Sequence, residues 1–169
     1  MDRKVLGIDP GLNITGYAVI RCQSNQFSLL EAGVLRSKPK DSLGQRLVQL
    51  RKGLEEVFAA HHPDEMSMEE LYSHYERPQT AILMGHARGV YCCTAAEHDV
   101  ETFNYAATQV KKVLTGNGRA PKAQMQMAVM QQFGLSEPPD PPDIADAMGI
   151  ALCHHFLTRQ TVISEMKTD

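Results

Sequence analysis

Four carboxylates stand where they could carry chemistry: Asp9 near the N-terminus, Glu69 in the middle, and Asp143 with Asp146 near the C-terminus. A ligand set made only of carboxylate oxygens suits Mg²⁺ or Mn²⁺ and not zinc. Two such ions roughly 4 Å apart would stabilise both the attacking and the leaving oxygen of a phosphodiester during hydrolysis. If the fold brings these acids together, we therefore expect a metal-dependent nuclease with two ions per active site.

Asp9 ends a short apolar run, residues 5–8, and is followed directly by Pro10 and Gly11. The run predicts a buried strand, and the Pro-Gly pair predicts a turn immediately after the carboxylate. Asp is also common at the start of such turns, so Asp9 taken alone is equally compatible with a structural role. The other acids are what favour a chemical one.

The remaining acids are predicted to lie beside Asp9. Residues 64–69 read as a strand of poor β propensity, and a position parallel to the first strand would bring Glu69 next to Asp9. Asp143 and Asp146 are three residues apart, which puts them on one face of the last helix. Like charges this close repel each other, and a cation offsets that cost. The alternative, acids that favour the helix dipole, explains Asp143 better than Asp146.

A basic segment lies inside a mildly acidic chain. The formal net charge is −3, from 17 Lys and Arg and 20 Asp and Glu residues. Residues 102–136 contain no acid and carry Lys111, Lys112, Arg119 and Lys122. Such a segment suits a phosphate backbone bound along one face, and an ordinary solvated surface is the alternative.

The elements that must position these residues follow from periodicity. Strands cluster first and then alternate with helices, which predicts an α/β layer fold with a mixed sheet. The clearest helix begins after Ser42, which with Gln45 offers a capping box. The expected strands cover residues 5–9, 26–35, 64–69 and 100–103, with a further strand after a loop within residues 12–20. The expected helices cover residues 43–61, 79–97, 105–114, 122–133 and 143–158.

Composition sets broader limits. With 169 residues, 43% of them hydrophobic, we expect one domain over residues 1–160 and a short polar tail over 161–169. No long uncharged apolar run and no signal-peptide pattern is present, so we expect a cytoplasmic protein without membrane contact. The four cysteines lack the paired spacing of a zinc site and are expected as reduced thiols in the interior. They are Cys22, Cys92, Cys93 and Cys153.

Two glycines mark the expected helix 79–97. Gly85 and Gly89 lie four residues apart, and each Gly costs a helix about 1 kcal/mol relative to Ala. Their shared face suggests that another backbone approaches closely there. Packing against the chain's own sheet and contact with a second subunit are both open.

A series of motifs runs in order along nearly the whole chain. They are Leu6-Gly7-Ile8-Asp9-Pro10-Gly11 with Thr15-Gly16-Tyr17, then Met68-Glu69-Glu70, Gly85-His86-Ala87-Arg88-Gly89-Val90, Tyr105-Ala106-Ala107 with Gln109-Val110-Lys111, and Asp143-Ile144-Ala145-Asp146-Ala147. Together they closely resemble the RuvC family, the bacterial Holliday-junction resolvases. The resemblance implies the ribonuclease H-like fold, with a mixed five-stranded sheet and helices on both faces.

The resemblance also implies an activity. RuvC family members are homodimers that use divalent metal to make paired, symmetric nicks across a four-way DNA junction in homologous recombination and DNA repair. The family's catalytic acids match Asp9, Glu69, Asp143 and Asp146; strand alternation lets only one of Glu69 and Glu70 face the site. The resemblance further suggests the branch-migration motor RuvA and RuvB as a partner, and a dimer interface on the helix that carries the two glycines.

DNA contacts are implied in the same way. Tyr72 follows the matched Glu as an aromatic residue does in the family, where it could stack on an unpaired base; a surface tyrosine is the alternative. Lys111 and Lys122 match family lysines that approach phosphates. Lys112 and Arg119 would extend that surface.

The loop 73–78 departs from the family pattern, since it is one residue longer and carries Glu76 where a cation would serve DNA better. Junction opening and sequence preference are therefore in question. Two other functions compete with the junction enzyme: a ribonuclease H-like RNA-processing nuclease, and a junction-binding module that does not cut. The pair Asp143 and Asp146 and the basic segment favour the junction enzyme over the first, and the presence of all four acids disfavours the second.

Overall fold

The computed structural model describes residues 2–23, 26–71 and 78–165. Five strands form one mixed sheet in the order β3-β2-β1-β4-β5. The first three strands form an antiparallel meander, and β4 and β5 continue the sheet parallel to β1. The strands are β1 (Asp2–Asp9), β2 (Ile14–Gln23), β3 (Gln26–Arg36), β4 (Glu65–Glu69) and β5 (Glu101–Tyr105).

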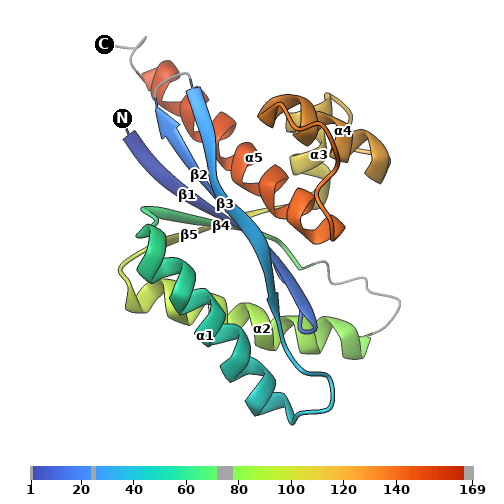
Figure 1. Ribbon diagram of the computed structural model, residues 1–169. Helices are drawn as coiled ribbons and strands as arrows, with labels where there is room; N and C mark the ends of the chain where they lie inside the picture. Colours follow the sequence, from blue (N-terminus) through green and yellow to red (C-terminus); the bar gives the residue numbers. More distant parts are fainter. Residues whose placement is uncertain (1, 24–25, 72–77, 166–169) are drawn as a thin grey trace.

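Helices cover both faces of this sheet (Figure 1). Two of them, α1 and α2, lie on one face, and the other three lie on the opposite face, with α5 running along the sheet. The predicted mixed five-stranded sheet with helices on both faces is thereby confirmed. The helices are α1 (Leu43–His61), α2 (Pro78–Glu97), α3 (Ala107–Thr115), α4 (Lys122–Phe133) and α5 (Pro142–Glu165).

Side-chain alternation decides which residues of β1 and β4 reach which layer. Leu6, Ile8, Met66 and Met68 pack in the buried core beneath α1 and α2. Val5 packs instead with apolar residues of α5. The side chains at odd-numbered positions of both strands therefore lie on the face that α5 covers. The last residue of each strand, Asp9 in β1 and Glu69 in β4, is an acid at such a position.

Glycines let α5 lie directly on β1 and β2. A Cβ atom added to Gly7 would stand 2.3 Å from the carbonyl oxygen of Ala147. One added to Gly16 would stand 2.0 Å from the carbonyl oxygen of Asp143. Because the obstructing atoms are backbone, no larger residue fits at either position, and the first turn of α5 is held against the end of β1.

Several element boundaries differ from expectation. Strand β5 extends to Tyr105, which was expected in the following helix, because Tyr105 pairs with Glu69 in the parallel ladder. Helix α5 continues to Glu165, past residue 158. The predicted capping box is present, with the Gln45 amide donating to Ser42 Oγ at 3.4 Å.

The outward-facing residues of α2 bear on two points raised by the sequence. Ala87 and Tyr91 face the core, so Gly85, Gly89 and Cys93, each two residues away, face outward. Cys93 is exposed, and the interior placement expected for it is wrong. Of the two alternatives left open for the glycines, packing against the chain's own sheet does not hold for Gly89, because a Cβ added there would meet nothing within 4 Å; Gly85 is half-buried, and a Cβ added there would lie 3.9 Å from Leu71 Cδ1. Among the described residues, no helix is both long and apolar enough to cross a bilayer.

Candidate active site

Asp9 is the last residue of β1, and the turn after it is tightly braced. Thr15 Oγ1 donates to the Gly11 carbonyl at 2.6 Å and accepts from the Gly11 amide at 3.0 Å. The buried Tyr91 hydroxyl of α2 lies 2.5 Å from the same Oγ1. Hydrogen bonds from Thr15, and through it from Tyr91 of α2, thus hold the Asp-Pro-Gly turn in one conformation. This fixes the direction of the chain immediately after Asp9.

Glu69 ends β4 beside Asp9. The parallel register pairs Ile8 with Met68, so the next residue of each strand emerges at the same sheet edge. Arg88 of α2 donates to the Glu69 carbonyl oxygen and, at 2.6 Å, to Asn104 Oδ1 of β5. Arg88 therefore ties the end of β4 to α2 and to the neighbouring strand β5. The neighbouring Glu70 is exposed.

The first turns of α5 bring the other two acids to this edge. Asp146 accepts from Lys122 Nζ at 2.9 Å, an ion pair between α5 and the start of α4. Asp143, one turn earlier, lies close enough to raise the pKa of Asp9, although it does not line the pocket described next. Its carbonyl oxygen faces Gly16 of β2.

These elements enclose a pocket of about 250 Å³, which we call the acid pocket. Three acids and two lysines supply its charged lining, and α3, α4 and α5 supply an apolar wall. The charged residues are Asp9, Glu69, Lys111, Lys122 and Asp146, and the apolar ones are Ala107, Val110, Met125 and Ile150.

The acids repel one another in this partly buried space. Burial, together with repulsion from Asp146, Glu69 and Asp143, raises the pKa of Asp9 to about 8. Burial and Asp146 also raise the pKa of Glu69. The bond to Asp146 raises the pKa of Lys122, which acts as a partial counter-ion. With all three lining acids ionised, the pocket would carry more negative charge than its two lysines neutralise, and the raised pKa values reflect the cost of that state.

This charge on the pocket lining bears on whether the pocket suits a cation. Among the described residues, no three acidic, His or Cys side chains are close enough to form a ready-made metal site. The donor chemistry nevertheless fits a hard divalent cation, because the candidate ligands are all carboxylates and charge neutralisation would relieve their repulsion. Small side-chain rotations, with Lys122 leaving Asp146, would be needed to complete such a site.

The other predicted DNA-contact residues are dispersed. Lys112, about 100° around α3 from Lys111, lines a separate groove of about 860 Å³ together with Arg159 of α5. Arg119 is exposed in the loop before α4 and does not line the acid pocket. Tyr72 and residues 73–77 lie outside the described residues.

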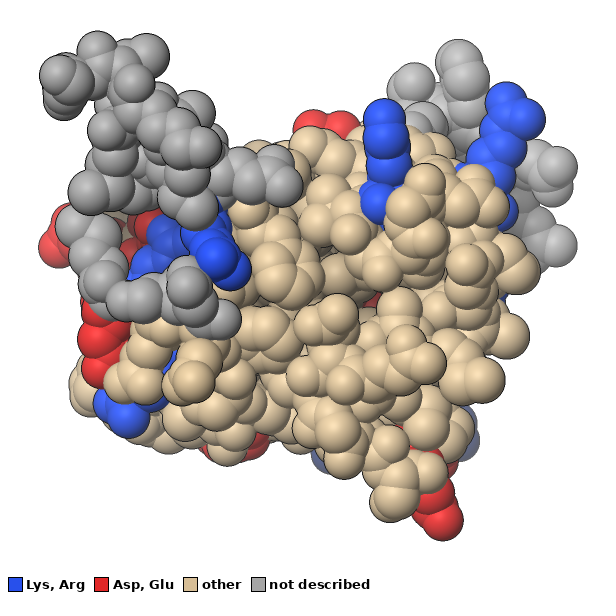
Figure 2. All heavy atoms as spheres, turned by 90° about the horizontal axis from the view of Figure 1, so that it is seen from above, with Lys and Arg blue, Asp and Glu red and all other residues tan. Residues whose placement is uncertain are grey.

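The face in Figure 2 is mostly uncharged, with Lys and Arg side chains gathered toward its margins. The Lys and Arg side chains visible on this face do not form one continuous basic surface.

Sequence reasoning missed two supports of the site. The position of Arg88 inside the Gly-His-Ala-Arg-Gly motif was a signal that could have pointed to it. Its hydrogen-bond acceptor, the carbonyl oxygen of Glu69, is evident only from the tertiary structure. Tyr91 carried no signal beyond an apolar helix position. Both come from α2, whose role in holding the ends of β1 and β4 depends on tertiary contact.

Comparison with known proteins identifies the chain's relatives. The family model described as "Crossover junction endodeoxyribonuclease RuvC" matches residues 5–154. The RuvC of Rhodopirellula baltica is 55% identical over 158 residues, covering 94% of this chain and 89% of that protein. The RuvC of Alkaliphilus oremlandii is 39% identical over 163 residues, covering 96% and 99%.

Solved structures agree with the sequence relatives. Thermus thermophilus RuvC in complex with a Holliday junction substrate has a TM-score of 0.88 at 31% identity, over 94% of this chain and 96% of that one. The yeast mitochondrial Holliday junction resolvase Ydc2 shares the fold, with a TM-score of 0.65 at 13% identity over 96% and 83%. This chain, with its ribonuclease H-like fold, therefore belongs to the RuvC family of crossover junction endodeoxyribonucleases.

Proposed function

We propose that this chain resolves four-way DNA junctions by metal-dependent phosphodiester hydrolysis in the acid pocket. The observation that carries the proposal is the convergence of Asp9, Glu69 and Asp146 with two lysines at one sheet edge of a RuvC family chain. The junction bound to the T. thermophilus relative supports this substrate. Family membership also favours a DNA junction over the RNA-processing alternative.

The four acids would hold the cofactor, which we propose to be two Mg²⁺ ions, with Mn²⁺ as a substitute. Asp9, Glu69, Asp143 and Asp146 supply the all-oxygen ligands that these ions prefer. Bound there, the cation supplies Lewis-acid charge at the scissile phosphate and lowers the pKa of water. Because Asp9 has a pKa of about 8 without cation, loading the site at neutral pH displaces a proton, and metal affinity should rise with pH up to that value.

The lysines are proposed to hold the DNA backbone. Lys111 and Lys122 line the same pocket as the acids, so a phosphate there would lie between cations and carboxylates. Lys122, freed from Asp146 by a bound cation, can donate to a phosphate oxygen instead. The lysines therefore position the scissile phosphate without reacting with it. Lys112 and Arg119 remain proposed contacts that extend the phosphate-binding surface, and Tyr72 remains a proposed stacking partner for an unpaired base near the crossover.

We propose that the chain forms a homodimer whose two subunits contact each other through α2. Ile82 and Leu83 are 61% and 38% exposed on this helix, and a Cβ on Gly89 would meet open space. Exposed apolar side chains next to glycines suit close approach of a second copy, and a two-fold axis would supply the two active sites that paired nicks need. By family resemblance, we also propose association with RuvA and RuvB and a cytoplasmic location.

Cleavage of an end-labelled four-way DNA junction, beside a matched linear duplex and an RNA duplex, tests the proposal with Mg²⁺ and with chelator. We expect symmetric nicks in the junction only, and only with metal. Asp146→Asn should lower the cleavage rate by about 100-fold or more, because it removes a metal ligand, while junction affinity in chelator is retained. Tight junction binding without cutting would instead establish a non-cleaving module, and cutting of RNA would establish the processing nuclease.

A further inference from the structure

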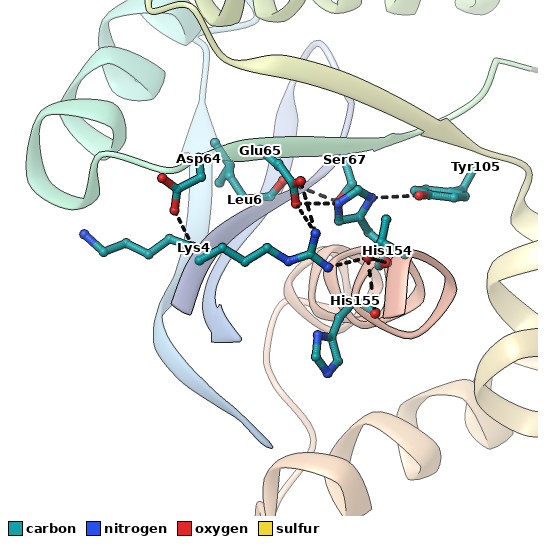
Figure 3. A network of polar contacts seen from close by, with 10 residues as sticks. Lys4, Leu6, Asp64, Glu65, Ser67, Tyr105, His154 and His155 are labelled. Atoms are coloured by element: carbon teal, nitrogen blue, oxygen red, sulfur yellow. Dashed lines mark hydrogen bonds and ion pairs between the residues drawn. The ribbon is translucent and has the colours of Figure 1, made fainter. Parts of the chain in front are cut away.

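At the end of β4 remote from the acid pocket, a buried polar network joins α5 to three strands (Figure 3). His154 of α5 is fully buried; its Nε2 lies 2.8 Å from Glu65 Oε2 and its Nδ1 lies 2.7 Å from the Tyr105 hydroxyl. Arg3 of β1 pairs with the same Glu65 oxygen at 2.9 Å. Arg3 also donates to the Thr158 hydroxyl, which itself donates to the His154 carbonyl at 2.7 Å. We call these five residues the His154 network.

Among the described residues, the network supplies directional side-chain contacts between α5 and the strands of the sheet, in addition to the ion pair of Asp146 with Lys122 of α4. Against β1 and β2, α5 presents Ala147, Ala151 and its own backbone to glycines, and such small, smooth surfaces specify the axial position of a helix poorly. Both nitrogens of the buried His154 ring are hydrogen-bonded, and breaking either bond in the interior would leave a polar group unsatisfied. The helix therefore has one favoured axial position, the one in which His154 meets Glu65.

The spacing of the residues links this position to the acid pocket. His154 follows Asp146 by eight residues, about 12 Å along a helix. Glu69 follows Glu65 by four residues, about 13 Å along a strand. The two lengths match, and α5 runs antiparallel to β4. When His154 lies on Glu65, Asp146 therefore lies beside Glu69, whose pKa it raises.

We propose that His154 and Glu65 are positioning residues that set the axial register of α5, and through it the place of Asp146 among the acids. The inference rests on the proposed catalytic role of Asp146. Neither positioning residue lines the acid pocket, so both act through the helix and the strand. Since a shift of about 1 Å in a catalytic group can cost about 100-fold in rate, even a small slip of α5 should be visible in kinetics.

Paired variants at both ends of the hydrogen bond test the proposal. His154→Phe keeps a ring against Phe103, whose centroid is 4.6 Å away, but removes both hydrogen bonds, whereas His154→Gln can still donate to Glu65. Glu65→Met removes the acceptor, and Glu65→Gln retains one. Thr158→Val is the matched control, because it weakens the network and leaves the pair of His154 and Glu65 in place.

Four measurements are made on each full-length variant: melting temperature, junction affinity in chelator, Mn²⁺ binding to the DNA-free protein by electron paramagnetic resonance, and single-turnover junction cleavage. We expect His154→Phe and Glu65→Met to cut about 10- to 100-fold more slowly and to bind Mn²⁺ more weakly. Their junction affinity should stay within about twofold of wild type. Both Gln variants and Thr158→Val should cut at nearly the wild-type rate.

Cleavage losses that follow melting temperature alone, with Thr158→Val as impaired as His154→Phe, would overturn the proposal. So would wild-type cleavage by both disruptive variants. Should His154→Phe not fold, Glu65→Met carries the same comparison. If the wild-type chain itself does not cut, the proposed function fails, and Mn²⁺ binding still decides whether the pair positions the acids.

Discussion

Removing one charge from the acid pocket should stabilise the metal-free protein, and the effect should depend on pH. Asp9→Asn replaces a partly buried carboxyl by a neutral group of nearly the same shape. Burial and the neighbouring acids raise the pKa of Asp9 from 3.8 to about 8. The folded protein therefore keeps a proton on Asp9 between about pH 4 and pH 8, whereas the unfolded chain has already lost it.

The sign and size of the effect follow from that difference. Because the unfolded state binds fewer protons in this window, the free energy of unfolding falls as pH rises from about 4 to about 8. A shift of about four pKa units corresponds to at most about 6 kcal/mol. Because solvent screening and side-chain rearrangement relieve part of the repulsion, we expect about 2–3 kcal/mol above pH 8. For a chain of this length that is about 4–12 °C in melting temperature.

Thermal unfolding followed by circular dichroism, in chelator and at pH values from 4 to 9, measures this difference. Asp9→Asn should melt higher than wild type at pH 8–9 and equally at pH 4. Glu137→Gln is the control, because Glu137 is exposed and its replacement removes the same charge at a site outside the acid pocket. Added Mg²⁺ should raise the melting temperature of wild type more than that of Asp9→Asn, because bound ligand stabilises the folded state.

Two results would refute this reasoning. Equal melting of Asp9→Asn and wild type at pH 9 in chelator would mean that the acids do not repel appreciably. A stabilisation that is just as large at pH 4 would mean that it arises from packing and not from the ionised carboxylate.

Three further outcomes are expected. Lys111→Ala should weaken junction binding and lower the slope of log affinity against log salt by about one unit; an unchanged slope in gel-shift titrations would remove Lys111 from the DNA contacts. Gly89→Leu should shift the protein toward monomer in sedimentation velocity, while Gly44→Leu, at an equally open helical glycine, should not; a dimer in both would place the interface elsewhere. Gly7→Ala should lower the free energy of unfolding by about 1–3 kcal/mol through overpacking against α5, as measured by urea denaturation; wild-type stability would contradict the close contact.

Much of the layout could be predicted because its signals are local. Residue alternation, three- and four-residue apolar spacing and the Asp-Pro-Gly turn each reflect chemistry within one segment. They predicted the meander, the helices and the position of Asp9 at a strand end, all of which the structure shows. The two-residue period of a strand allowed only one of Glu69 and Glu70 to face the site; the resemblance to the family selected Glu69, which lines the acid pocket.

Contacts between distant segments were beyond such signals. Lys111 and Lys112 are equivalent in sequence, yet only Lys111 lines the acid pocket, because the packing of α3 on α5 turns its neighbour toward another groove. His154 and His155 are equally alike. His154 joins Glu65 and Tyr105, whereas His155 packs against Phe27, with neither ring nitrogen bonded to a described partner.

The sequence by itself therefore determined which elements form, and which acids, lysines and turns they carry, since each depends on neighbours a few residues away. Tertiary structure alone decided how these elements meet. Three such contacts join residues more than fifteen positions apart: the close packing of α5 on Gly7, the hydrogen bond of Arg88 to the end of β4, and the register between α5 and β4. Such contacts are selected by the packing of the whole domain, which no single segment encodes.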